Sequence, residues 1–168
     1  LDIEQGQFIA ILGHNGSGKS TFAKHINALL SPTEGTIWVD GMDTKDEAKL
    51  WDIRQTAGMV FQNPDNQIVG TSVEEDVAFG PENKNIEPEK IRKIVETVLR
   101  KVKLWDRRKA SPSILSGGQK QRTAIARAMA NNPTLILADE PTGNLDSKNS
   151  QEVLALLQTC LLYTSDAA

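Results

Sequence analysis

The segment GHNGSGKST, from Gly13 to Thr21, constrains the fold of this chain more than any other feature. Glycines at these spacings let successive backbone N–H groups curl around phosphate oxygens, and the lysine after them neutralises β- and γ-phosphate charge. The Ser20 hydroxyl is then placed to ligate Mg²⁺. The expected nucleotide-contacting residues are Gly13, His14, Asn15, Gly16, Ser17, Gly18, Lys19, Ser20 and Thr21.

A phosphate loop of this kind lies between a buried strand and a helix, and the flanking sequence predicts both. Phe8 to Leu12 is wholly apolar, as in a strand buried on both faces of a parallel sheet. Apolar residues recur at helical spacing from Lys19 to Leu30, where Ser31-Pro32 ends the pattern. We therefore expect a strand, loop and helix unit that binds MgATP.

The rest of the chain alternates between strand and helix patterns, which indicates an α/β fold with a mainly parallel sheet flanked by helices. A long polar connection, 62–85, interrupts this alternation and has the character of a functional loop. A tight turn is expected at Asp40-Gly41. The expected strands are 36–39, 57–61 and 135–138, and the expected helices are 45–53, 73–79, 88–103, 120–131 and 147–157.

Two acidic residues, Asp139 and Glu140, follow the apolar run Leu135 to Ala138. A phosphate-loop ATPase needs a carboxylate at the end of such a strand to hold Mg²⁺ through its water shell. A second carboxylate beside it can polarise the attacking water. Solvated acids often end strands, so the pair by itself indicates a structural role. Together with the phosphate loop, it predicts Asp139 at the metal and Glu140 as the catalytic residue at the water.

A second glycine-rich segment, LSGGQ at Leu115 to Gln119, opens a predicted helix. Serine is a suitable N-cap, and the glycines expose backbone donors at the positive end of that helix. One interpretation is a capped helix and nothing more. The other is a second phosphate-binding surface that completes the site of another molecule. Its members would be Ser116, Gly117, Gly118 and Gln119.

These motifs occur in the order found in ABC transporter ATPases, and the chain resembles that family up to about residue 157. The resemblance implies a P-loop NTPase domain over 1–159, incomplete, with an inserted helical subdomain over roughly 63–130 that carries LSGGQ. The segments that carry the resemblance are the phosphate loop, Gln62 after its strand, LSGGQ with Lys120 to Arg122, LILADEP, and Asn144 to Asp146.

The same resemblance implies roles for individual residues. Gln62 would contact the γ-phosphate and Mg²⁺ and relay the ATP state to a transport partner, which makes it both a catalytic and a metal residue beside Ser20 and Asp139. The LSGGQ residues would contact ATP held by an opposing subunit in a homo- or heterodimer, and Asp146 would lie at the dimer interface. The implied activity is ATP hydrolysis, with ATP and Mg²⁺ as cofactors.

Composition limits the partners of the chain. Its 168 residues carry a formal net charge of -3, with a pI near 5.4, so there is no global electrostatic attraction to nucleic acid or to an anionic membrane. No apolar run approaches the roughly 18 residues of a spanning helix. We therefore expect a transmembrane transporter subunit to hold the chain at the cytoplasmic face of the cell membrane. The single cysteine, Cys160, excludes an internal disulfide framework.

Both ends of the sequence predict an incomplete chain. It begins at Leu1 in a strand-like stretch, without the adenine-stacking aromatic that the resemblance places upstream. The family's switch histidine, expected beyond residue 157, is also absent, and His14 and His25 are interpreted as a loop residue and a partly packed helix residue. Residues 160–168 break the helical pattern and can be encoded by a transposon-end adapter. We interpret them as a non-native tail, with an ordinary polar terminus as the alternative.

The two halves of the chain resemble different transporter classes. Phe61 to Gln67 with Val73 to Gly80 resembles the ATPases of energy-coupling-factor transporters, which import vitamins or metal ions; there this segment borders the groove for the partner's coupling helix. Ala126 to Ala128 and Ala138 to Asp146 instead resemble lipoprotein-release and macrolide-export ATPases. A join between two genes at LSGGQKQR and a natural intermediate paralogue both explain the disagreement.

An energy-coupling-factor importer is the expected function, and the exporter class is the first alternative. A soluble ABC ATPase that acts on DNA or ribosomes is the second. Soluble members insert coiled coils or linkers between the phosphate loop and LSGGQ, whereas this interval is compact and has no heptad array. Transport is therefore favoured, and no nucleic-acid partner is expected.

Overall fold

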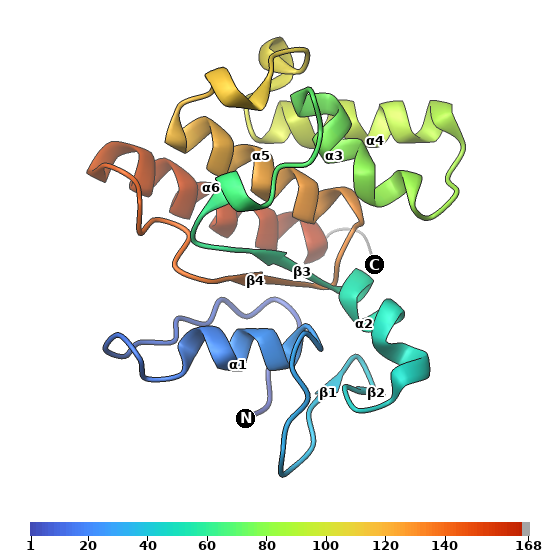
Figure 1. Cartoon of the computed structure of the whole chain (residues 1–168), viewed down its shortest axis with the longest axis vertical. Coiled ribbons are helices and arrows are strands. Elements are labelled where there is room, and N and C mark those ends of the chain that lie inside the picture. Colours follow the sequence, from blue (N-terminus) through green and yellow to red (C-terminus); the bar gives the residue numbers. More distant parts are fainter. Residues whose placement is uncertain (166–168) are drawn as a thin grey trace.

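The computed structural model describes the backbone of residues 1–165 and their side chains, except those of Asn66 and of residues 160–165. Two parallel strands, β3 (Ala57–Val60) and β4 (Leu135–Ala138), lie at its centre and pair from Ala57 with Leu135 to Val60 with Ala138. Helices α5 (Gly117–Ala130) and α6 (Ser147–Ser165) cover one face of this pair, and α1 (Lys19–Ile26) lies on the other (Figure 1).

Helices α3 (Val73–Glu82), α4 (Pro88–Lys101) and α5 pack together because each carries apolar residues on one face. Val77, Leu99 and Ile125 have 0% of their surface exposed. All three helices lie within the predicted helical subdomain, 63–130. The 3-10 segment η2 (Pro64–Asn66) lies between β3 and α3, and two more, η3 (Trp105–Arg107) and η4 (Pro112–Ile114), lie between α4 and α5.

The segment between α1 and β3 forms a small hairpin and a helix. Strands β1 (Trp38–Val39) and β2 (Met42–Asp43) pair antiparallel, and η1 (Glu47–Lys49) leads into α2 (Leu50–Thr56). Asp40 and Gly41 both have positive φ, 50° and 73°, which matches the twist of a two-residue hairpin turn. The turn predicted at Asp40-Gly41 is confirmed.

The strand predicted at Phe8 to Leu12 is wrong for the described structure. These residues have no strand conformation, and Phe8 and Leu12 are 51% and 91% exposed. A strand needs a neighbour for its N–H and C=O groups. The edge of β4 that is not paired with β3 faces the segment Ile3 to Ile11 across a cavity of ≈ 400 Å³ lined by both, so no described strand lies against Phe8 to Leu12.

Several helix bounds also differ from the sequence prediction. Helix α1 ends at Ile26, before the predicted Leu30, because Ala28 adopts a left-handed φ of 52° and the amide of Leu29 returns to the Lys24 carbonyl. Helix α3 continues past 79 to Glu82, and α5 starts at Gly117. No helix in the described part of the chain is long and apolar enough to cross a membrane.

The last helix bears on the predicted tail. Helix α6 runs from Ser147 to Ser165, beyond the predicted end at 157. Among residues 147–159 of α6, Val153 and Leu157 are buried and pack into the main core. Of the predicted non-native tail, 160–168, the last three residues lie outside the described residues, and the origin of the tail stays a prediction.

Candidate nucleotide site and partner groove

Glycine conformations shape the phosphate loop before α1. Gly16 and Gly18 have φ of 82° and 91°, a region that other L-residues rarely adopt. Gly13 is closely packed, because a Cβ there would lie 2.5 Å from Oγ and 3.2 Å from Cβ of Ser17. The loop closes on itself through the Ser17 amide, which donates to the His14 carbonyl at 3.2 Å. The sequence therefore folds Gly13 to Gly18 into a tight, exposed loop at the start of a helix.

Lys19, the first residue of α1, turns back over this loop. Its Nζ donates to the carbonyls of Gly13 at 3.0 Å and His14 at 3.1 Å, and lies 3.5 Å from Oε1 of Glu140. The ammonium is therefore already fixed above the loop, where it meets one of the two predicted acidic residues. Its side chain is 19% exposed and that of Glu140 is 38% exposed.

The structure brings Ser20 and Asp139 together although 119 residues separate them. The Ser20 hydroxyl donates to Oδ1 of Asp139 at 2.8 Å, and the Asp139 amide donates to the Val60 carbonyl, also at 2.8 Å. Hydroxyl and carboxylate oxygens are the hard ligands that Mg²⁺ takes, together with phosphate and water oxygens. The donor set fits Mg²⁺ beside a nucleotide. No cluster of three or more His, Cys, Asp or Glu among the described residues offers a protein-only metal site.

Gln62, directly after β3 and Phe61, completes this cluster. Its Nε2 donates to Oε2 of Glu140 at 3.2 Å, so Lys19 and Gln62 each contact one oxygen of the same carboxylate. Glu140 has a positive φ of 45°, a strained conformation that tends to occur at functional sites. The predicted residues Lys19, Ser20, Gln62, Asp139 and Glu140 therefore form one connected site.

Two further residues lie against Gln62 and were not predicted as site residues. Asn144 donates from Nδ2 to the Gln62 carbonyl at 3.4 Å. Gly143 passes so close that a Cβ there would lie 3.0 Å from Nε2 of Gln62. The signal in the sequence was the segment after LILADEP that carries the resemblance; the contact of Asn144 with Gln62, 82 residues away, is not visible in that segment.

The LSGGQ segment forms a separate surface. Ser116 and Gln119 make a capping box, in which the Gln119 amide donates to Oγ of Ser116 at 3.3 Å and the Ser116 amide donates to Oε1 of Gln119 at 3.0 Å. Gly118 packs against α6, where a Cβ would lie 2.3 Å from Oδ1 of Asn149. No hydrogen bond or ion pair among the described residues joins Ser116 to Gln119 with the phosphate loop.

Asp146 lies beside this surface at the start of α6. It accepts from the Asn149 amide at 2.9 Å and from Nδ2 of Asn149 at 2.6 Å. Both hydrogen bonds lower the pKa of the Asp146 carboxyl, and the bond from the Asn149 backbone amide has the larger effect. A charged, preorganised turn thus lies next to the glycines of LSGGQ.

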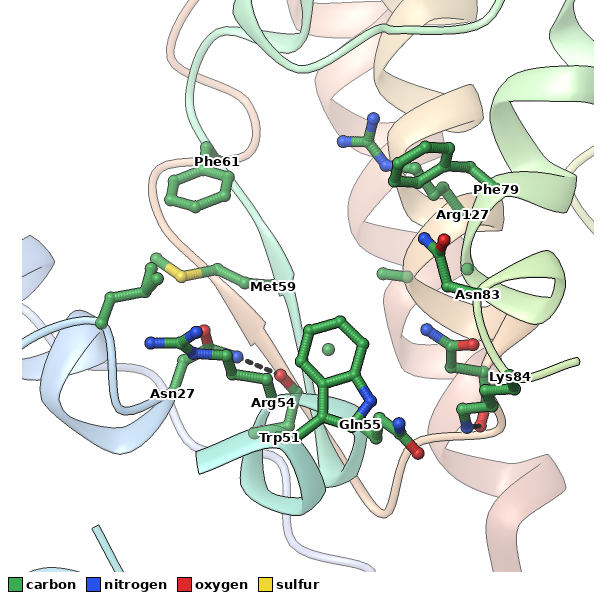
Figure 2. A pocket seen from close by; sticks show the side chains of 16 residues that line it. Asn27, Trp51, Arg54, Gln55, Met59, Phe61, Phe79, Asn83, Lys84 and Arg127 are labelled. Atoms are coloured by element: carbon green, nitrogen blue, oxygen red, sulfur yellow. Dashed lines mark hydrogen bonds between the residues drawn. The ribbon is translucent and has the colours of Figure 1, made fainter. Parts of the chain in front are cut away.

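A groove of ≈ 330 Å³ lies on another face, between α2 with β3 and α3 with α5. Figure 2 shows Met59 and Phe61 on one side of it and Phe79, Asn83 and Lys84 on the other. Three of its apolar side chains are largely exposed, at 44% for Leu29, 58% for Trp51 and 50% for Phe79. Apolar side chains that share an open groove form a candidate interaction surface.

Polar groups line the rest of the groove. Lys84 donates to the Asn131 carbonyl at 3.3 Å, and burial lowers the pKa of its ammonium. Oδ1 of Asn131 is buried and has no hydrogen-bond partner among the described residues. The sequence predicted that the segment after Phe61 borders such a groove. It did not predict Trp51 or Lys84, which reach the groove from other parts of the fold.

Comparison with known proteins identifies relatives over most of the chain. The family model described as "ABC transporter" matches residues 1–143. The energy-coupling factor transporter ATP-binding protein EcfA1 of Clostridioides difficile (strain 630) is 61% identical over 158 residues, which cover 94% of this chain and 57% of the relative. The protein of the same name from Caldanaerobacter subterraneus subsp. tengcongensis gives the same identity and coverage. The chain spans just over half the length of these curated relatives.

Solved structures confirm the predicted fold class, a P-loop NTPase with an α/β core. The structure of cbiO1 from Clostridium perfringens, described as part of the ABC transporter complex cbiONQ, superimposes with a TM-score of 0.90 at 35% identity, covering 98% of this chain and 66% of that one. The ATP-binding cassette MJ0796, in a dimeric post-hydrolysis state bound to ADP and Pi, gives a TM-score of 0.84 at 40% identity, covering 96% and 72%.

Proposed function

Because this chain belongs to the ABC transporter family, we propose that it binds MgATP at its phosphate loop and hydrolyses it to power a transporter. The observation that carries the proposal is the convergence of Lys19, Ser20, Gln62, Asp139 and Glu140 from three separate segments. A structural turn would need none of these contacts. A phosphate-transfer site needs all of their chemical groups in one place.

In the proposed site the loop amides and Lys19 hold the β- and γ-phosphates. Ser20 and Asp139 would hold Mg²⁺ beside the nucleotide, and the side-chain oxygen of Gln62 would be a third ligand. Bound Mg²⁺ would neutralise charge on the phosphate oxygens. Glu140 orients and polarises the attacking water through its carboxylate. Since Lys19 and Gln62 both contact that carboxylate, the same two residues that meet the phosphate also position the catalytic group.

Lys19→Ala tests nucleotide binding directly. Loss of a charge-assisted bond to phosphate costs about 1.5–3 kcal/mol, so the affinity for a fluorescent ATP analogue should fall about 10- to 150-fold. Lys24→Ala is the matched control, because it removes the same charge from the same helix α1, away from the loop. Equal affinity of Lys19→Ala and wild type would refute the assigned phosphate site.

We further propose that two such chains form a composite site, in which Ser116 to Gln119 of one meets ATP on the phosphate loop of the other. The separation of the two surfaces within one chain supports this arrangement, and so does the dimeric cassette among the structural matches. In a chain extended to the length of its relatives, Glu140→Gln should accumulate a dimer with MgATP. Size-exclusion chromatography that finds only monomer while ATP is bound would exclude the composite site.

The partner is proposed to be a transmembrane transporter subunit that seats a segment in the groove between α2, β3, α3 and α5, which would place the chain at the cytoplasmic membrane face. The exposed apolar side chains of that groove support this partner, as do relatives named for the energy-coupling factor transporter. Alignments of 158 residues run through both halves of the chain, which favours this class over the exporters.

Trp51→Ala tests the partner groove. It should weaken co-purification with the detergent-solubilised transmembrane subunits of an energy-coupling factor transporter from one of these relatives. Trp38→Ala is the matched control, since Trp38 is 64% exposed and does not line the groove. Retention by Trp51→Ala equal to that of Trp38→Ala would exclude this face.

A further inference from the structure

One guanidinium, that of Arg127 on α5, joins three parts of the molecule. Its Nη1 donates to the Gln67 carbonyl, and its Nη2 donates to Oε1 of Gln67 at 2.9 Å. Nη1 also lies 3.4 Å and 3.5 Å from the two carboxylate oxygens of Asp76 on α3. The Asp76 side chain is 0% exposed and that of Arg127 only 18%, so the pair is withdrawn from solvent. Arg127 thereby ties the connection between β3 and α3, residues 61–72, to helices α3 and α5.

Asp76 fixes the far end of the same connection. Its Oδ1 accepts from the amides of Val69 at 2.8 Å and Gly70 at 3.2 Å. Gly70 packs directly on the helix, because a Cβ there would lie 2.3 Å from the backbone nitrogen of Asp76. The connection cannot shift at Gly70 without moving α3 or breaking these bonds.

The near end of the connection is the nucleotide site. Gln62 contacts Glu140, and Nε2 of Gln121 on α5 donates to the Phe61 carbonyl at 3.3 Å. Helix α5 itself begins with the LSGGQ glycines. Arg127 is therefore bonded to the segment that starts at Gln62 and stands on the helix that starts at the second phosphate surface.

Arg127 also lines the groove, where Figure 2 shows it beside Phe79. We propose that Arg127 is a positioning residue that couples occupancy of the groove to the position of Gln62, and so to ATP turnover. The inference rests on the proposed function, which assigns the nucleotide to Gln62 and the partner to the groove. A segment seated in the groove contacts the guanidinium that holds Gln67 and, through Asp76, the far end of the connection. By thermodynamic linkage, nucleotide at Gln62 must then alter the groove equally.

Hydrogen exchange followed by mass spectrometry tests the coupling from the nucleotide side, on the 168-residue chain with and without MgAMP-PNP. In wild type, the analogue should slow exchange at 67–71 and in α3 about 5-fold or more, the lower end of typical coupling between sites. Arg127→Lys keeps a positive charge beside Asp76 but lacks the planar fork that holds Gln67. This variant should bind MgAMP-PNP like wild type and protect the phosphate loop, without slowing exchange at 67–82.

Arg122→Lys is the matched control. Arg122 lies on the same helix, is 19% exposed and pairs with Glu152 on α6 at 3.7 Å, away from the groove. Its response to MgAMP-PNP should equal that of wild type. If Arg127→Lys does not fold, the double variant Asp76→Asn, Arg127→Gln removes both charges, and it should fold and lose the response.

If MgAMP-PNP slows hydrogen exchange at 67–82 in the Arg127 variants as much as in wild type, the coupling role is overturned. It is also overturned if wild type binds MgAMP-PNP and hydrogen exchange at 67–82 does not slow. A wild type that does not bind MgAMP-PNP overturns the proposed function itself, and this inference with it.

Discussion

Glu140→Gln is expected to tighten the binding of MgATP about 1.4- to 5-fold, even though it removes the proposed catalytic carboxylate. In the structure, Oε1 of Glu140 lies 3.5 Å from Nζ of Lys19. A phosphate group that pairs with the Lys19 ammonium must compete with the Glu140 carboxylate for it. The two side chains are 38% and 19% exposed, so solvent screens the pair and its contribution is about 0.2–1 kcal/mol. That range converts to the expected ratio of dissociation constants.

Titration of a fluorescent, non-hydrolysable ATP analogue by anisotropy measures this ratio. The advantage of the variant should shrink when salt rises from about 0.1 M to about 1 M, because the Debye length falls from about 10 Å to about 3 Å. Glu152→Gln is the matched control. It removes the same charge, but Glu152 faces Arg122 at 3.7 Å and lies away from the phosphate loop, so affinity should not change.

Two results would refute this reasoning. An unchanged or weaker affinity in Glu140→Gln would mean that the carboxylate does not compete with phosphate for Lys19. An equal gain in Glu152→Gln would mean that net charge alone, rather than the contact with Lys19, sets the affinity.

Three further predictions concern stability. Ser116→Ala removes the acceptor for the Gln119 amide and should lower the free energy of unfolding by about 0.5–2 kcal/mol in urea titration; no change would show that the capping box is dispensable. Leu99→Ala, at a side chain with 0% exposure, should lower it by about 2–5 kcal/mol by the same measurement, and a smaller loss would mean that the cavity collapses. Hydrogen bonds from Asn149 lower the pKa of Asp146 below its ordinary 3.8, so its stabilisation is present above that pH and lost as pH falls through the folded value. Asp146→Asn should therefore flatten this part of the acid-unfolding profile, and an unaltered profile would contradict the assignment.

The strand predicted at Phe8 to Leu12 shows where local pattern is insufficient. The run is apolar enough for a buried strand, yet it lies exposed opposite the unpaired edge of β4. Strand formation depends on a hydrogen-bonding neighbour that a local pattern cannot supply. In contrast, β4 was predicted with the right bounds, and it has β3 beside it.

Features with a short-range cause followed from the sequence alone. Gly16 and Gly18 specify the phosphate loop because they adopt positive φ values that other residues rarely take, and Gly13 because a Cβ there would crowd Ser17. Ser116 with Gln119 specifies the start of α5, since both partners of the capping box lie within one turn. The phosphate loop and LSGGQ also identified the family, which the comparisons confirm.

Only the tertiary structure decided which distant groups meet. Ser20 reaches Asp139 across 119 residues, Gln62 reaches Glu140 across 78, and Arg127 reaches Asp76 across 51. Each is a polar or charged contact whose strength depends on burial and on distance. A linear sequence pattern shows neither the burial of a group nor its distance from a partner. The sequence determined the chemical groups and the local shape of each segment. Packing of α1, α3 and α5 around β3 and β4 determined that these groups form one site and one junction.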